Sequence, residues 1–214
     1  MRYLFVWRIF SSLIAAALCL LVASTAQAQT CQESLKTGQR HFGLFHQDPA
    51  HLDQAITAYQ AAVADPGCAY EARWRLAELY LVYGTIQTPK PKKLELFKRG
   101  QEEALKAVEV KPGSPEGHYF YAVNLGSQIE VEGVMRNIFK LKKLIAEIDK
   151  ALAIDPNFAP ALVVKARFMA ELPGIIGGND AKAEELFKKA LKADPVCEIA
   201  YTEYASFLAD RRRF

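Results

Sequence analysis

Small and large apolar residues recur along the chain at offsets that match the period of an α-helix. In the clearest example, Ala183 is followed by Phe187 and then by Ala190, and Pro195 closes the segment. Offsets of four and three positions keep side chains on one face of a helix. The small residues let a second helix approach closely, and the proline ends the helix. The pattern therefore predicts pairs of closely packed amphipathic helices.

The same spacing occurs again earlier in the chain. The further copies are Ala55-Tyr59-Ala62 before Pro66-Gly67, and Leu144-Ile148-Ala151 before Pro156. About twelve residues ahead of Ala55 lie Phe42 and Gly43, an apolar residue followed by a small one, and similar pairs recur in register further on. This arrangement resembles the tetratricopeptide repeat (TPR), whose helix pairs repeat about every 34 residues.

The resemblance implies an all-α fold, a right-handed TPR-like α-solenoid of about four helix pairs plus a C-terminal closing helix. Within one domain at 29–214, the expected units are about 36–69, 70–114, 115–158 and 159–197, followed by the closing helix 198–212. Three segments lengthen the chain relative to the family pattern, at 85–91, 128–133 and 172–178. Such inserts could form a binding edge or a pore, or they could be tolerated loop growth.

A narrower resemblance lies in the second half of the chain. The run 117–126 (GHYFYAVNLG), the segment 151–156 (ALAIDP) and the segment 177–180 (GGND) together resemble the TatT family, the periplasmic TPR component of TRAP-type transporters. That resemblance implies a helical, often oligomeric module that acts beside a periplasmic solute-binding protein. Parts of the run 117–126 are also similar to the eukaryotic regulators of microtubule dynamics, which are repeat proteins too.

The first 28 residues have the features of a secretory signal peptide. Arg2 and Arg8 give a positive start, an apolar run spans 9–22, and the segment 26–28 (AQA) is a cleavage site. We therefore expect a periplasmic or secreted protein cleaved after Ala28, with an uncleaved membrane anchor as the alternative. Without those two arginines, 25 Lys and Arg face 24 Asp and Glu, a net charge of +1. This balance argues against a nucleic-acid partner.

Three cysteines follow the predicted cleavage site, at Cys31, Cys68 and Cys197. A pair of cysteines in an exported protein is expected to oxidise. Cys31 precedes the first predicted helix and Cys68 follows the second, and two antiparallel helices bring those ends together. We expect a Cys31–Cys68 disulfide that stabilises the N-terminal repeat by roughly 4 kcal/mol. Cys197 is expected to be an unpaired, partly buried thiol.

The sequence contains no convincing active site. Because Gly-x-Ser-x-Gly and His-Glu-x-x-His are absent, we expect no enzymatic activity, no cofactor and no metal site. His41, His46 and His51 recur every five residues, a spacing that scatters them around a helix and into a loop instead of around one metal. His118 is expected to make a hydrogen bond at a helix start or between helices.

The first helix of each pair is expected to line a concave groove. The residues predicted to face it are Arg40, Leu44, Trp74, Glu78, Leu81, Tyr119, Val123, Gly126, Val163, Arg167, Thr202 and Ser206. They form an apolar, aromatic strip with charges at intervals, which is typical of a ligand or partner surface. Trp74 and Tyr119 would anchor the partner, unless these side chains instead pack between repeats.

Two functional hypotheses follow. The first is an exported, non-catalytic TPR binding module that acts with a periplasmic solute-binding protein, as the TatT resemblance implies, or that holds an apolar small ligand. The second is a general periplasmic scaffold for envelope protein complexes. A homo-oligomer is compatible with either hypothesis.

Overall fold

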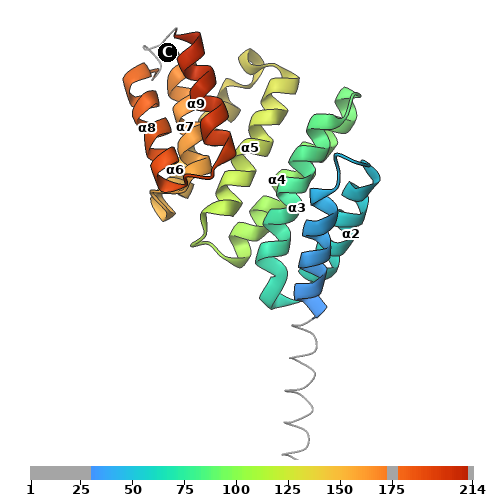
Figure 1. Cartoon of the computed structure of the whole chain (residues 1–214). Coiled ribbons are helices and arrows are strands. Elements are labelled where there is room, and N and C mark those ends of the chain that lie inside the picture. Colours follow the sequence, from blue (N-terminus) through green and yellow to red (C-terminus); the bar gives the residue numbers. More distant parts are fainter. Residues whose placement is uncertain (1–29, 173–177, 212–214) are drawn as a thin grey trace, which may run out of the picture. The chain divides into compact units, whose positions relative to one another are not determined.

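The computed structural model describes residues 30–172 and 178–211, and every regular element in these ranges is a helix. The elements are a helix at 30–43, α2 (Ala50–Val63), α3 (Pro66–Ile86), α4 (Lys90–Val110), α5 (Pro115–Glu132), the 3-10 helix η1 (Val134–Asn137), α6 (Ile138–Ile154), α7 (Ala159–Glu171), α8 (Asp180–Ala193) and α9 (Glu198–Asp210) (Figure 1). The predicted all-α fold of four TPR-like helix pairs and a closing helix is confirmed. The predicted signal peptide lies outside the described residues.

The chain divides into two compact units, and the boundary falls within α3, after Arg75. In the first unit, the helix at 30–43 packs against α2. Leu52, Ala55, Tyr59 and Ala62 of α2 are buried, as the spacing of the small and aromatic residues predicts. A Cβ atom placed on Gly38 would collide with the ring of Tyr59, so only a glycine allows this close approach.

A disulfide between Cys31 and Cys68 ties the start of the helix at 30–43 to the start of α3. The two Cα atoms lie 6.1 Å apart, and both residues are buried. The pairing is the one expected from the sequence. Cys197 is a buried free thiol in the second unit.

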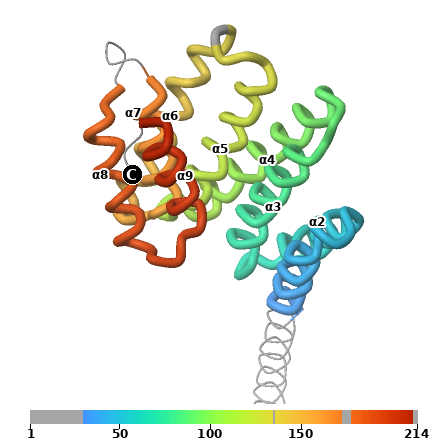
Figure 2. Tube along the Cα trace, turned by 45° about the horizontal axis from the view of Figure 1, so that its top comes forward, coloured from blue at the N-terminus to red at the C-terminus, as the bar shows by residue number. Residues whose placement is uncertain are grey.

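In the second unit, α4 packs on α5, α5 on α6, and α7 on both α8 and α9. Figures 1 and 2 show α7, α8 and α9 side by side at the C-terminal end of the chain. Their shared core contains Leu162 and Val163 of α7, Phe187 of α8 and Phe207 of α9. The rings of Phe187 and Phe207 lie 5.5 Å apart. Ala183, Phe187 and Ala190, whose spacing in the sequence predicted a shared buried face, all lie in this core.

A buried asparagine connects three helices of the second unit. Asn124 of α5 is fully buried, and its side-chain amide donates to the backbone oxygens of Ala77 in α3, at 3.0 Å, and Phe120 in α5, at 2.8 Å. On α4, Gly100 lies against the same side chain, because a Cβ there would come within 2.5 Å of Asn124 Cγ. The polar contact therefore requires a residue without a side chain on α4.

Two of the predicted inserts are extensions of helices. The segment 85–91 is mostly absorbed by the long helices α3 and α4, which leaves a connection of three residues. The segment 128–133 forms the last turn of α5 and its C-cap, Gly133, whose φ of 101° favours glycine. Most of the third insert, 173–177, lies outside the described residues.

No helix in the described part of the chain is long and apolar enough to cross a membrane.

Replacing both Cys31 and Cys68 by alanine is expected to lower the free energy of unfolding by about 4 kcal/mol, because the crosslink restricts the unfolded chain. Urea unfolding followed by circular dichroism measures the change. In unfolded but unreduced protein that lacks residues 1–28, a thiol reagent should label Cys197 alone. Labelling of all three cysteines would contradict the disulfide.

The Gly100→Ala substitution is expected to destabilise the protein by about 1–3 kcal/mol, since the added methyl group overpacks the contact with Asn124. Gly113→Ala is the matched control, because a Cβ there meets no atom within 4 Å. Thermal unfolding of the two variants provides the comparison. Equal melting temperatures would show that α4 and α5 do not depend on this close approach.

Candidate functional site

Two adjoining hollows, of about 120 and 200 Å³, lie between α5, α6 and α7 in the second unit. Both are lined by Gly126 and Glu130 of α5, Leu144 of α6, and Phe168 and Glu171 of α7. We call the surface formed by these five residues and the flanking Val123, Val134, Leu141, Val164 and Arg167 the α5–α7 groove. It lies entirely within one unit, so its geometry is defined by helices that pack directly on one another.

Helical spacing explains why these residues meet. Val123, Gly126 and Glu130 follow one another at offsets of three and four along α5, and Val164, Phe168 and Glu171 do so along α7, so each set shares one helix face. Gly126 provides the space between them. A Cβ atom at this position would lie 3.1 Å from Leu144 Cδ1, so a larger residue would fill part of the hollow.

The rim of the groove is acidic. Arg167 forms ion pairs with Glu171 and with Glu203 of α9, each at 3.3 Å. Glu130 is exposed and makes no hydrogen bond or ion pair with any residue that the structure describes. Arg167 therefore pairs with two carboxylates, and the carboxylate of Glu130, which lines the same hollow, makes no ion pair with a described residue.

One end of the groove has an exposed apolar edge. Val134 of η1 lines the larger hollow and is 50% exposed. Ile138 and Phe139, at the start of α6, are 49% and 81% exposed, although neither lines the hollow. A phenylalanine this exposed gains free energy if a partner covers it. Apolar residues grouped at the rim of a groove are typical of a contact surface.

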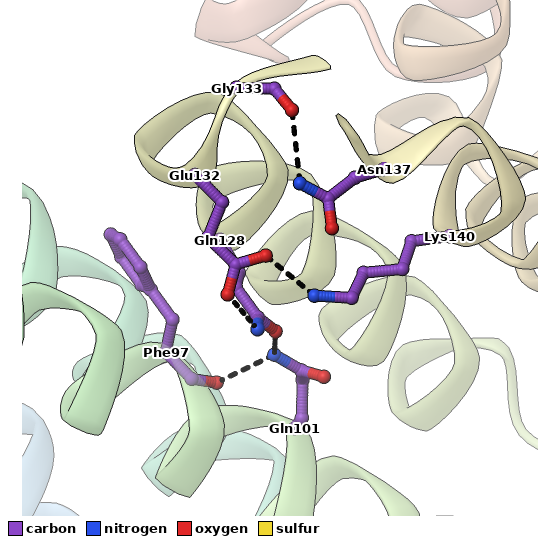
Figure 3. A network of polar contacts seen from close by, with 7 residues as sticks. All are labelled: Phe97, Gln101, Gln128, Glu132, Gly133, Asn137 and Lys140. Carbon is purple, nitrogen blue, oxygen red and sulfur yellow. Dashed lines mark hydrogen bonds and ion pairs between the residues drawn. The ribbon is translucent and has the colours of Figure 1, made fainter. Parts of the chain in front are cut away.

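A network of polar side chains fixes the segment that carries this edge (Figure 3). Gln101 of α4 donates to Gln128 of α5 at 2.9 Å, and Gln128 donates to Glu132 at 2.8 Å. Lys140 of α6 donates to the other oxygen of Glu132. The hydrogen bonds from Lys140 and Gln128 lower the pKa of Glu132 and outweigh the opposing effect of burial. Three helices are thus held together where α5 ends.

A second polar contact joins α5 to α6. His118 Nδ1 lies 2.6 Å from Glu147 Oε2, and Lys150 Nζ lies 2.9 Å from Glu147 Oε1. Burial raises the pKa of Glu147, but the hydrogen bonds from Lys150 and His118 outweigh it and the pKa is lowered. The prediction of an inter-helix hydrogen bond for His118 is confirmed.

The residues predicted to face one groove lie at several different places in the structure. In the first unit, Arg40 is exposed, Leu44 is half-buried, and Trp74 is half-buried with the Arg75 guanidinium 4.0 Å from its ring centroid. In the second unit, Glu78 and Leu81 are half-buried on α3. Of the predicted residues, Val123, Gly126 and Arg167 line the α5–α7 groove, whereas Thr202 and Ser206 are exposed on α9.

Tyr119 and Val163 lie in the core, which corrects their predicted position on an exposed strip. Tyr119 is 8% exposed and Val163 is completely buried. The ring of Phe158, which directly precedes α7, packs edge-on against Tyr119 at 5.5 Å. Burial also raises the pKa of the Tyr119 hydroxyl far above its ordinary value. Tyr119 therefore packs under Phe158 and Val163 is enclosed, so neither side chain lies on an exposed strip.

The prediction from sequence missed Glu130, Leu144, Phe168 and Glu171, which form the shared lining of the groove. Helical spacing could have identified one of them, because Glu130 stands four positions after Gly126, which was predicted to face the groove. Leu144 was interpreted only as a core residue of the second helix. Its side chain is buried but also forms the floor of both hollows.

Among the described residues, one group of cysteine and carboxylate side chains has the spacing that a metal site requires. Cys31, Cys68 and Asp65 lie close enough to share one metal ion. However, the two sulfurs are joined in the disulfide, and the thiolate is the form that binds metals.

Comparison with known proteins identifies both the repeat fold and a family. The family model described as "Regulator of microtubule dynamics protein 1-3" matches residues 43–173, more than half of the chain. Regulator of microtubule dynamics protein 3 of Bos taurus is 32% identical over 91 residues, which cover 42% of this chain and 19% of that protein. The chain thus spans about a fifth of that relative.

Among solved structures, a thermophilic TPR protein of Thermus thermophilus is 22% identical and has a TM-score of 0.64, with 86% of this chain and 84% of that chain covered. The likeness shows the TPR fold alone. MamA is 20% identical with a TM-score of 0.46, over 78% of this chain and 82% of that one. Of the two narrower resemblances in the sequence, the matching family model bears out the one to the regulators of microtubule dynamics, whereas the one to TatT stays a prediction.

The Glu147→Gln variant is expected to be less stable than the wild type by about 1–3 kcal/mol near neutral pH, because the hydrogen bonds to a charged carboxylate are weakened. Since the folded pKa of Glu147 is lowered, this difference should persist above the unfolded pKa and disappear as the pH falls through the folded pKa. Urea unfolding across this pH range, with Glu185→Gln as the control, measures it. A difference that stays constant with pH would contradict the assignment.

Proposed function

Because the chain belongs to the Regulator of microtubule dynamics protein 1-3 family, and because its fold is that of a TPR protein, we propose that it is a non-catalytic binding module for a protein partner. The α5–α7 groove is the proposed contact surface. The observation that supports this most directly is an apolar hollow lined by Leu144, Phe168 and the half-exposed Val134, beside the exposed carboxylate of Glu130, which has no ion-pair partner among the described residues.

The size of the hollows favours a peptide segment over a small ligand. Drug-sized and cofactor-sized molecules occupy pockets of about 300–1,000 Å³. The two hollows measure about 120 and 200 Å³ and are open to solvent, which suits one or two apolar side chains of a partner. An apolar small ligand, the alternative in the first hypothesis, would have to fill both hollows together to reach the lower end of that range.

The charge of the rim favours a partner segment with basic residues. Glu130 and Glu171 line the groove together with Arg167, which pairs with Glu171 and Glu203, so a lysine or arginine of the partner would find an opposite charge at Glu130. Rim charges chiefly set the association rate and exclude wrong partners. The proposed partner segment is therefore apolar in its centre and basic at one or both ends.

We further propose that the module works outside the cytoplasm, after removal of residues 1–28. The basic start, apolar run and Ala-x-Ala segment of the N-terminus support this location. An exported protein would not meet microtubules, so the family relationship carries over the fold and not the partner that the family name indicates. A TatT-like role beside a solute-binding protein, or a general scaffold for envelope complexes, are the two candidate settings.

The proposal predicts which peptides bind. A peptide library screened against the purified protein should enrich apolar segments that carry lysine or arginine. Phe168→Ala, which removes part of the groove wall, should weaken the best peptide at least tenfold. Glu130→Lys should weaken it about fivefold, the expected size for one rim charge.

Glu185→Lys is the matched control for the charge change, because Glu185 is exposed on α8 and does not line the groove. Equal effects of Glu130→Lys and Glu185→Lys would overturn the groove as the binding site. Cross-linking of the protein in native periplasm, followed by mass spectrometry, separates the two settings. A single solute-binding protein supports the transporter role, and a range of envelope-assembly proteins supports the scaffold.

A further inference from the structure

Two histidines from neighbouring helices meet in the first unit. His41 lies in the helix at 30–43 and His51 in α2, and their Nδ1 atoms are 3.0 Å apart. The rings are stacked with centroids 5.1 Å apart and planes 30° from parallel. The sequence analysis placed these histidines apart from one another, around a helix and in a loop, and this is wrong for His41 and His51. The turn at 44–49 reverses the chain between them, so residues ten positions apart become neighbours.

The side-chain oxygen of Gln54 lies next to the same histidine pair. Gln54 Oε1, one turn along α2, lies 2.8 Å from His51 Nδ1. In a neutral imidazole, Nδ1 carries either one proton or one lone pair. His51 Nδ1 can therefore satisfy either His41 or Gln54 fully, but not both. A cation that accepts lone pairs from all three side chains would satisfy the whole group.

We propose that His41 Nδ1, His51 Nδ1 and Gln54 Oε1 form a binding site for a divalent transition-metal ion. Imidazole nitrogen and amide oxygen suit copper(II), nickel(II) and zinc(II), and Cu²⁺ should bind most tightly of these. The site lies outside the α5–α7 groove and is independent of the proposed function.

The observed distances are close to those that a metal requires. At a metal–ligand distance of about 2.1 Å, tetrahedral ligand atoms lie about 3.4 Å from one another. The spacings of 3.0 and 2.8 Å therefore need to widen by only a few tenths of an ångström. Both histidines are partly exposed, so an ion can enter from solvent and water can complete its coordination.

Two features define how strongly the site should bind. The helix at 30–43 and α2 hold the two imidazoles together before the metal arrives, which reduces the cost of ordering them. Arg40 precedes His41 in the chain and its positive charge opposes a cation. Replacing Arg40 by glutamine should therefore strengthen metal binding about two- to fivefold, the range for one exposed charge.

Isothermal titration of the untagged protein with Cu²⁺ and, separately, with Zn²⁺ tests the proposal. His41→Ala and His51→Ala should each weaken binding at least tenfold, and Gln54→Ala should weaken it less. Gln54→Glu, which adds a negative ligand, should strengthen it. His46→Ala is the matched control, because this exposed histidine lies in the same turn but outside the group. Circular dichroism verifies that each variant is folded.

A second measurement does not depend on any variant. In NMR spectra of the histidine rings, Zn²⁺ should shift the resonances of His41 and His51 and leave those of His46 and His118 unchanged. Loss of binding in His46→Ala equal to that in His41→Ala would overturn the proposal. So would the absence of any Zn²⁺-dependent shift at His41 and His51.

Discussion

Helices of this chain approach closely where a glycine on one helix faces a large side chain on another. In the first unit, Gly38 faces the ring of Tyr59, and in the second, Gly84 faces the ring of Phe97. Each ring occupies the space that a Cβ atom would need. Because protein interiors are packed as densely as organic crystals, these positions leave little freedom in the distance between helices. They therefore determine where every other side chain of a helix pair can lie.

The α5–α7 groove also depends on a glycine, but here no large side chain fills the space beside it. Gly126 also lacks a side chain, but only one methyl group of Leu144 reaches toward it. The unfilled space becomes part of a hollow and not part of the core. The helices around it do not close the gap, since the Glu132 network and the Glu147 contacts hold α5 and α6 at a fixed separation. A groove that stays open without a partner needs little reorganisation when it binds one.

The sequence was sufficient for the helix pairs because each depends on local spacing. Ala183, Phe187 and Ala190 predict a buried face, and that face is buried. It was also sufficient for the Cys31–Cys68 pairing, which requires only that two helices be antiparallel. It was insufficient for Tyr119, since the residue that covers it, Phe158, lies beyond the following helix. The contact between His41 and His51 likewise depends on the path of a turn, which periodicity does not specify.

Net charge and local charge lead to different conclusions about partners. The predicted mature chain is almost neutral, so its overall charge attracts neither basic nor acidic molecules. At the groove, however, Glu130 and Glu171 give a local excess of negative charge next to apolar side chains.

The segment that matches the family, 43–173, contains all the groove residues on α5, α6 and α7. Glu203, which pairs with Arg167, lies on α9 outside that segment. The family fold thus forms the groove, whereas the charge that would select its partner depends partly on a helix beyond the family match.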